Sequence, residues 1–248
     1  ALGWSKSSST VYFMNFQGML EYSRNFGVHS VDAFLNYLAE DKLGSDYSSG
    51  WLLPFHRIQL GGHAKYGYDN RYFLQFDFTH AGSEQMMKGN QFHFSPTVSG
   101  AWVVSNEAFM KNQDIVNLLK FRVSFGALEY DNLWNFSSRY LYADDIRQAN
   151  GSGLINSIFT CALVTEGALG NPKIKWEKSY QQNYGIDLSL FNVLNLSVDY
   201  WKTKQRSVLC KSELIPELSG FSSSDFPYEN LGKVLNQGVD IEVGYTKK

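Results

Sequence analysis

Residues 171–204 read NPKIKWEKSYQQNYGIDLSLFNVLNLSVDYWKTK, and they decide the fold class. Over residues 180–190 every second residue is apolar, with Gln182 as the exception, and a second apolar row covers residues 194–200. A period of two is that of a β-strand with one apolar face. Each arm has about a dozen residues, roughly 40 Å and twice the usual length of a soluble strand. The stretch therefore predicts a hairpin of an outer-membrane barrel, with a tight turn at 191–193.

The composition suits a β-sheet protein and excludes two other classes. Aromatic residues make up 16% of the 248 residues, with 15 Tyr and 18 Phe beside 21 Gly, as expected for strands, turns and interfacial girdles. The net charge of −2 gives no electrostatic footprint for nucleic acid. Mean hydropathy is −0.28, and the absence of a run of about eighteen apolar residues excludes a helical membrane protein. Residues 1–10 lack the pattern of a signal peptide, so we expect any export signal to lie upstream or to have been removed.

The same alternation recurs along the chain and predicts nine strands. Beside the two arms of the hairpin, they cover residues 10–24, 27–39, 55–68, 71–80, 91–102, 118–127 and 232–245. Pro96 would remove a ladder hydrogen bond, so we expect a bulge or irregularity in the fifth of these strands. A helical turn is expected within residues 105–117, and a small extra hairpin within residues 154–164.

The connections alternate in length, which carries topological information. Short turns at residues 25–26, 69–70 and 191–193 alternate with long polar segments. In an up-and-down barrel the short turns share the periplasmic rim and the long loops share the extracellular rim. We therefore expect four loops outside the cell, at residues 40–54, 81–90, 128–177 and 207–229. Since nine is an odd number and no closing aromatic strand follows, we expect a partial barrel.

Several aromatic residues are candidates for anchors at the membrane interface. Tyr12 and Tyr22 lie ten positions apart on one face of the first strand. That separation is about 33 Å of strand, which a tilt near 40° reduces to roughly 25 Å, the height of the apolar band of an outer-membrane barrel. The full set of candidate anchors is Tyr12, Tyr22, Trp102, Trp176 and Trp201.

The hairpin at residues 171–204 resembles the late-barrel segment of the SusC/RagA family of TonB-dependent outer-membrane transporters. Four further blocks resemble the family's consecutive barrel segments in the same order: YGYDNRYFLQFDFTHAGSEQ, FSPTVSGAWVVSNEAFM, LLKFRVSFGALEYDN and LGKVLNQGVDIEV. The resemblance covers residues 11–248. At residues 80–83 the chain has HAGS where the family commonly has Arg-x-Asp-Gly-Ser, so no role for a charged pair is carried over to that position.

The resemblance implies a larger protein, with a barrel of about 22 strands, an internal plug and a segment that contacts TonB. We expect residues 1–248 to form about nine strands of that barrel, with the plug domain and the final strands outside this chain. The resemblance also implies location in the outer membrane, a SusD-like lipoprotein that caps the barrel, and import of oligosaccharides or peptides. The energy would come from the inner membrane through TonB.

Candidate contacts with substrate or partner are aromatic residues in the predicted loops: Trp51, Trp134, Tyr140 and Tyr142. They could stack on sugar rings or meet the capping lipoprotein; the alternative is that each long loop packs on itself. Seven charged residues fall on the polar faces of the strands and are candidates to line a wet lumen: Arg57, Lys65, Asp77, Lys120, Arg122, Asp187 and Asp199. Their alternative role is solvation and mutual pairing against the plug.

We find no constellation for catalysis, for a metal or for a cofactor. Asp144 and Asp145 have nothing to fix the separation that paired catalytic carboxylates need, and the five histidines are too far apart for a local metal motif. Cys161 and Cys210, both placed in loops, could form a disulfide in an oxidising compartment or remain as two small unpaired residues. The sequence therefore predicts no enzyme.

A second class of protein fits the same alternating strands, namely a soluble or surface-attached β-sandwich that binds carbohydrate. The two classes predict opposite burial. In a barrel the apolar rows face lipid and the charged rows lie inside, whereas in a sandwich the apolar rows pack on each other and the charged rows face water.

Overall fold

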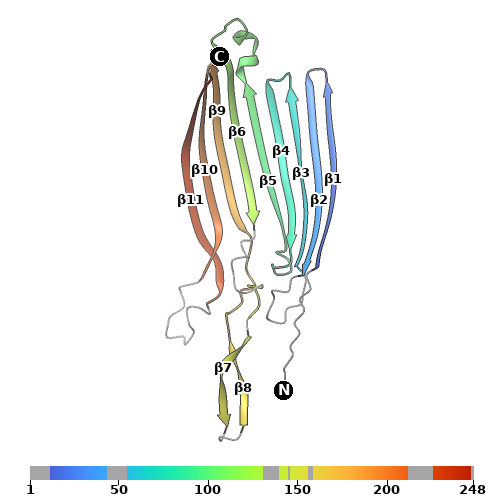
Figure 1. Cartoon of the computed structure of the whole chain (residues 1–248), viewed down its shortest axis with the longest axis vertical. Coiled ribbons are helices and arrows are strands. Elements are labelled where there is room, and N and C mark those ends of the chain that lie inside the picture. Colours follow the sequence, from blue (N-terminus) through green and yellow to red (C-terminus); the bar gives the residue numbers. More distant parts are fainter. Residues whose placement is uncertain are drawn as a thin grey trace, which may run out of the picture.

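The computed structural model describes residues 12–43, 55–130, 140–144, 146–155, 159–211 and 226–246. Nine strands form one antiparallel sheet in the order β1-β2-β3-β4-β5-β6-β9-β10-β11, and β7 and β8 form a separate hairpin (Figure 1). The bounds are Tyr12–Phe26 (β1), His29–Leu43 (β2), Phe55–Tyr68 (β3), Tyr72–Ser83 (β4), Phe92–Val103 (β5), Val116–Tyr130 (β6), Ile146–Ile155 (β7), Phe159–Glu166 (β8), Glu177–Leu190 (β9), Leu194–Lys211 (β10) and Tyr228–Tyr245 (β11). The all-β fold and the nine-stranded sheet are confirmed.

The strands differ from the predictions mainly at their ends. Most extend a few residues beyond the expected bounds, and the extra hairpin, β7 and β8, begins before the predicted residue 154. The expected helical turn is present as two 3-10 turns, Val104–Asn106 and Ala108–Met110. Within the described ranges, neither of these turns is long or apolar enough to be a membrane-spanning helix.

The connections alternate between two rims along the chain, although length alone does not assign all of them, because the connection between β5 and β6 is longer than that between β4 and β5. The turns after β1, β3 and β9 and the connection between β5 and β6 lie together at one end of the sheet, the short-turn rim (Figure 1). The strand ends that the long connections join, together with the described connection between β4 and β5, lie at the other end, the long-loop rim. Asp69 and Asn70 have φ of 49° and 51°, the left-handed conformation that a two-residue hairpin of type I′ requires and that these residue types tolerate.

Pro96 interrupts the sheet on one side only. Its pairing with Phe78 of β4 lies in a continuous register, so β4 and β5 show no bulge there. The ladder between β5 and β6 ends one residue away, at Thr97. Beyond it, the side chain of Ser95 accepts a hydrogen bond from the backbone N–H of Glu129 at 2.8 Å. The irregularity is therefore an early end of one ladder, which suits a residue without an N–H.

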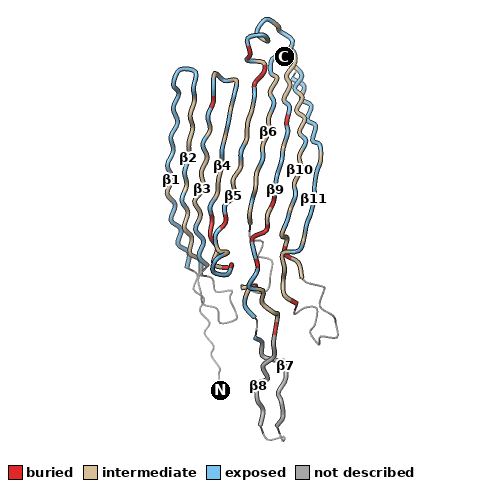
Figure 2. The backbone as a smooth tube through the Cα atoms, turned by 180° about the vertical axis from the view of Figure 1, so that it is seen from behind, coloured by how far each residue is buried: buried red, intermediate tan, exposed pale blue. Residues whose placement is uncertain are grey.

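The apolar rows are the exposed ones. In β4, Tyr72, Leu74 and Phe76 are exposed, whereas the residues that alternate with them, Phe73, Gln75 and Asp77, are half-buried. A similar alternation follows several inner strands of the sheet, whereas β1 and β11 are exposed along most of their length (Figure 2). Among the described residues no second layer covers the apolar face. The burial expected of a β-sandwich is therefore contradicted, and that expected of a barrel wall is found. We call the apolar face the outer face and the polar face the inner face.

The apolar band on the outer face runs obliquely to the hydrogen-bonded rows. On β1 it covers residues 12–22, and on β11 it covers residues 239–245. When the residue pairing is followed from each strand to the next across the sheet, Tyr22 of β1 lies in the same transverse row as Gln237 of β11. Gln237 is just outside the apolar band on β11. From each strand to the next, the apolar band therefore moves towards the short-turn rim by slightly more than one residue. This shift corresponds to a strand tilt of roughly 35–40°. That is the tilt of a transmembrane barrel.

A small buried cluster, the rim core, joins segments far apart in sequence at the long-loop rim. It consists of Met86, Leu141, Ile174, Trp176 and Leu209, with Tyr228 packed against it. Trp176 is only 5% exposed, and its indole Nε1 donates a hydrogen bond to the carbonyl oxygen of Asn90 at 2.6 Å. Its ring centroid lies 4.3 Å from that of His93. The prediction that Trp176 anchors in the lipid interface is therefore wrong, because the ring is inside the protein.

At the short-turn rim, Glu107 ties the connection between β5 and β6 to the sheet. Its carboxylate accepts hydrogen bonds from the hydroxyl of Tyr72 at 2.5 Å, from the indole of Trp102 at 3.1 Å and from the guanidinium of Arg71 at 2.9 Å. The hydrogen bond from Tyr72, followed by those from Trp102 and Arg71, lowers the pKa of Glu107 below its ordinary value.

Replacing Trp176 with alanine removes the largest side chain of the rim core. Buried Trp→Ala changes cost about 3–5 kcal/mol, so we expect the free energy of unfolding of the complete protein in detergent to fall by about that amount. Protease cutting near residues 167–176 should rise with it. Phe109→Ala is the control, because that ring is 71% exposed. Unchanged stability and cutting in the Trp176 variant would contradict the rim core.

Acidification should weaken the Glu107 attachment. Because the pKa of Glu107 is lower in the folded protein than in the unfolded chain, its contribution to stability is present above the unfolded pKa and is lost as pH falls through the folded pKa. Glu107→Gln should be less stable than wild type at pH 7. Melting temperatures of both proteins from pH 7 to pH 3 should converge towards acid, and a difference that stays constant would refute this.

Candidate functional site

The inner face carries transverse rows of polar side chains, each row made of residues paired directly across neighbouring strands. One row contains Asp32, Lys65, Gln75, Ser99, Ser124 and Asn183. The adjacent row towards the long-loop rim contains His63, Asp77, Thr97 and Gln181. Six of the seven predicted lumen residues, all except Arg57, lie in these rows or in the next two inner rows towards the short-turn rim, on β3, β4, β6, β9 and β10, and are half-buried. Arg57 pairs with Glu40 and Ser83 nearer the long-loop rim and is exposed.

Arg122 is the centre of the strongest charge network on the inner face. From β6 its guanidinium donates two hydrogen bonds of 2.8 Å to Asp187 of β9 and one of 3.0 Å to Asp199 of β10. Ser197 of β10 donates to Asp187 at 2.8 Å. Such paired, charge-assisted bonds are both strong and directional. The network therefore connects three neighbouring strands through side chains alone.

Gly185 makes this connection possible. It lies on β9 directly between Arg122 and Asp199, with which it is paired on either side. A Cβ at this position would come within 2.5 Å of the Oδ1 of Asp199 and 2.8 Å of the Cζ of Arg122. The missing side chain leaves the path along which the guanidinium crosses β9. The alternation of polar and apolar residues does not predict that this glycine is important. Its role is visible only from the pairing of β9 with β6 and β10.

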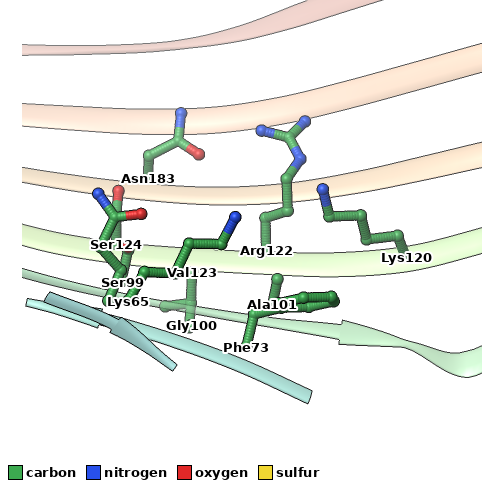
Figure 3. A pocket seen from close by; sticks show the side chains of 11 residues that line it. Lys65, Phe73, Ser99, Gly100, Ala101, Lys120, Arg122, Val123, Ser124 and Asn183 are labelled. Carbon is green, nitrogen blue, oxygen red and sulfur yellow. The ribbon is translucent and has the colours of Figure 1, made fainter. Parts of the chain in front are cut away.

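Beside the network the inner face has a hollow of about 360 Å³. Its polar lining includes Lys65 from β3, Lys120 and Arg122 from β6, Gln75 from β4 and Asn183 from β9. Lys65, Lys120, Arg122 and Asn183 extend from the same side of the sheet in Figure 3. The alternation predicts that these residues share a face, but it does not predict that they share one hollow.

Further predicted lumen residues make local contacts. The ammonium of Lys65 lies 5.6 Å from the ring centroid of Phe73, a cation–π distance. Asp77 accepts hydrogen bonds from the side chain of Gln75 at 2.8 and 3.0 Å. These contacts hold the residues in place on the wall. Because the lining of the hollow includes the donors of Lys65, Lys120 and Asn183, the hollow suits an anionic or hydrogen-bonding partner.

The predicted interface anchors divide into two groups. Tyr12, Tyr22 and Trp102 lie on the outer face and are 40–48% exposed. Trp102 belongs to a row of aromatic neighbours on that face that also contains Tyr68, Tyr72 and Phe121. Trp201 is different, because it pairs with Asn183 and Gly238 in an inner row. Its assignment as a lipid anchor is wrong: the parity of the strand, which it shares with Asp199, outweighs its aromatic character.

The predicted loop contacts are partly described. Tyr140 and Tyr142 lie next to each other at the long-loop rim, with ring centroids 5.5 Å apart, and are half-buried. Leu141 between them is in the rim core, and the Asp144 side chain accepts a hydrogen bond from the backbone N–H of Gly170. The two tyrosines are thus held on a packed base. Trp51 and Trp134 lie outside the described residues.

Both cysteines are in strands, not in loops as predicted. Cys161 is in β8, and Cys210 is in β10, where its half-buried thiol lies 3.8 Å from the carbonyl oxygen of Glu229. Over the described ranges, no group of three or more His, Cys, Asp or Glu side chains is arranged to hold a metal ion.

Gly185→Ala should break the crossing between Arg122 and Asp199. The added methyl group would displace the guanidinium from a partly buried carboxylate, for which we expect a loss of about 1–3 kcal/mol in the free energy of unfolding. Gly18→Ala is the matched control, because a Cβ at Gly18, on the outer face of β1, would meet nothing within 4 Å. Equal unfolding curves for the two variants in detergent would show that the crossing does not contribute to stability.

Comparison with known proteins places this sheet in a family. Residues 161–246 match the family described as TonB dependent receptor-like, beta-barrel. TonB-dependent receptor P39 of Formosa agariphila is 34% identical over 235 residues, which are 94% of this chain and 19% of that protein. TonB-dependent receptor SusC of Bacteroides thetaiotaomicron is 25% identical over 191 residues, 75% of this chain and 18% of SusC. The chain thus spans about a fifth of the length of these curated relatives.

Solved structures share the fold. The RagAB peptide importer in its 'closed-closed' state superimposes with a TM-score of 0.76 at 19% identity, over 96% of this chain and 28% of that one. The siderophore receptor PirA from Pseudomonas aeruginosa gives a TM-score of 0.56 at 11% identity, over 94% of this chain and 40% of the receptor. The chain therefore belongs to the outer-membrane β-barrel of the TonB-dependent receptors, among relatives of the SusC/RagA kind.

Proposed function

We propose that this chain forms part of the wall of an outer-membrane importer that takes up oligosaccharides or peptides. The complete protein would have a plug inside the barrel and a segment that receives energy through TonB, both outside residues 1–248. The final strands would also lie outside this chain. In this arrangement the short-turn rim faces the periplasm and the long-loop rim faces the cell exterior.

The inner face is the observation that carries the proposal. Its half-buried charges are paired across strands, above all Arg122 with Asp187 and Asp199, and they lie on the face opposite the exposed apolar rows. Buried charge of this kind is costly unless it lines water or protein. A barrel of about 22 strands encloses a lumen that a plug fills. The hollow beside Lys65 and Lys120 is a suitable place for that plug to dock or for substrate to pass.

The relatives support TonB-dependent import and, through one of them, a peptide as the nutrient. SusC is a TonB-dependent receptor, and RagAB is a peptide importer. We propose a SusD-like lipoprotein as the partner at the long-loop rim. There the pair Tyr140 and Tyr142, fixed on the rim core, offers two rings for stacking on a sugar or for contact with the lipoprotein.

Uptake measurements test the function and separate the two substrate classes. A strain that lacks the complete gene should lose uptake of one class in a panel of labelled oligosaccharides and peptides. The wild-type gene should restore uptake, and an uncoupler of the inner membrane should abolish it. Unaffected uptake of the whole panel in the deletion strain, or uptake that survives the uncoupler, would refute TonB-dependent import.

The double variant Tyr140→Ala/Tyr142→Ala tests the proposed contact. Two stacking rings contribute together about 1.4 kcal/mol or more, so the concentration for half-maximal uptake should rise about tenfold. Phe109→Ala, an exposed ring at the opposite rim, is the control. If the double variant took up substrate as wild type does, and if the lipoprotein co-purified with it in wild-type amounts, the two rings would have only a packing role.

A further inference from the structure

One part of the outer face departs from its apolar character. Gln182 of β9, Lys202 of β10 and Gln237 of β11 form a row in which the apolar pattern of the outer face stops. The next row towards the long-loop rim contains Tyr180, Lys204 and Leu235, and the one after it contains Lys178, Arg206 and Lys233. We call the five cationic residues Lys178, Lys202, Lys204, Arg206 and Lys233 the basic patch. Gln182 therefore interrupts the alternation of its strand at the edge of a charged surface.

Three cations of the basic patch stand side by side. Arg206 pairs directly with Lys178 on one flank and with Lys233 on the other. Like charges opposite each other in a sheet repel, and this repulsion destabilises the pairing. Among the described residues of these three rows, the single carboxylate is that of Glu129. Its Oε1 lies 2.6 Å from the Nζ of Lys178. The patch therefore has an excess of positive charge that an external anion would stabilise.

The position of the patch restricts what the anion can be. On the same strands, the next outward residues towards the short-turn rim are Tyr184, Tyr200 and Val239, which are exposed and lie in the apolar band. From that band to the row of Arg206 is about six residues of strand, roughly 15 Å along the barrel axis at the tilt of this sheet. Basic residues at the edge of an apolar band extend their charged ends to the headgroup level of the membrane.

Arg206 also has a geometry suited to a phosphate. Its Cζ lies 5.9 Å from the ring centroid of Tyr180, which holds the guanidinium against the outer face. A guanidinium fixed in this way presents parallel donors to the oxygens of a phosphate, and the flanking lysines add point charges. By contrast, the outer face of β5 at the same end carries Phe92 and Phe94, so the cations of the basic patch, all on β9, β10 and β11, do not extend to β5.

We infer that the basic patch is a binding site for a lipid with an anionic, phosphate-bearing headgroup. The phosphate lies across Arg206 and its two lysine neighbours, and the acyl chains follow the apolar surface of β9, β10 and β11. A lipid is the one occupant that satisfies both halves of this surface at once, because it joins an anion to a hydrocarbon of the right height. Binding of this lipid relieves the repulsion among the three cations.

A lipid titration of the complete transporter tests the site. The protein in a neutral detergent is titrated with phosphatidylglycerol, with phosphatidylcholine and with inorganic phosphate, and bound lipid is counted by native mass spectrometry. Phosphatidylglycerol should bind in preference to phosphatidylcholine. The double variant Arg206→Gln/Lys233→Gln should bind it about 20- to 30-fold more weakly, since each basic residue at an anionic surface contributes a factor of roughly five. High salt should weaken binding to wild type more than to the variant.

The same variants give a second readout that does not depend on lipid counting. Without anionic lipid, the double variant should melt at the same temperature as wild type or higher, because repulsion has been removed. With phosphatidylglycerol, wild type should gain more than the variant. Lys111→Gln, which removes an exposed lysine at the short-turn rim, is the matched control and should behave as wild type. Lys204→Gln, a single change in the adjacent row, serves if the double variant does not fold.

Three outcomes would overturn the inference. Equal affinity of wild type and of the patch variants for phosphatidylglycerol would remove the site. An equal response to phosphatidylcholine would show that the headgroup charge is irrelevant, and an equal response to inorganic phosphate would show that the patch binds a free ion. Unchanged lipid binding with loss of a tightly bound protein partner from the variant would assign the surface to that partner.

Discussion

The backbone of a membrane-spanning chain has no water with which to form hydrogen bonds, and this constraint shapes the whole sheet. Each strand interior must satisfy its N–H and C=O groups on its neighbours. Nine strands therefore form one continuous antiparallel ladder, and the loss of one partner, as at Pro96, is confined to a place where a ladder ends. The side chains then follow the period of the pleat, with apolar rows towards lipid and polar rows towards the lumen.

Because that period is local, much of the fold can be predicted from sequence. The alternation over residues 180–200 gives both the strands and their faces, and Asp69 with Asn70 marks a turn by residue type alone. Features that depend on segments far apart in sequence could not be predicted in this way. Trp176 is buried because four other segments of the chain pack around it. The residues next to it in sequence do not distinguish it from a tryptophan at the membrane interface. The position of Trp201 in the alternation of its strand, two residues from Asp199, places it on the inner face. Its aromatic character led to the wrong assignment as a lipid anchor.

The candidate site divides in the same manner. That Arg122, Asp187 and Asp199 share the inner face follows from the alternation of their strands. That they form one network depends on the pairing of β6, β9 and β10, and on a glycine whose importance is visible only once those strands are in register. The basic patch is similar, since Lys178, Arg206 and Lys233 are 28 and 27 positions apart in sequence and adjacent in the sheet.

The crossing of Arg122 over Gly185 has a mechanical consequence. A strand shifted by two residues re-forms the same backbone hydrogen bonds and keeps the same faces, so the backbone ladder alone does not choose between these registers. A guanidinium anchored in two carboxylates on successive strands works as a diagonal brace, since any sliding of β9 or β10 would lengthen its contacts unequally. The network thereby adds a preference for the native register of β6, β9 and β10, which the backbone hydrogen bonds alone do not supply.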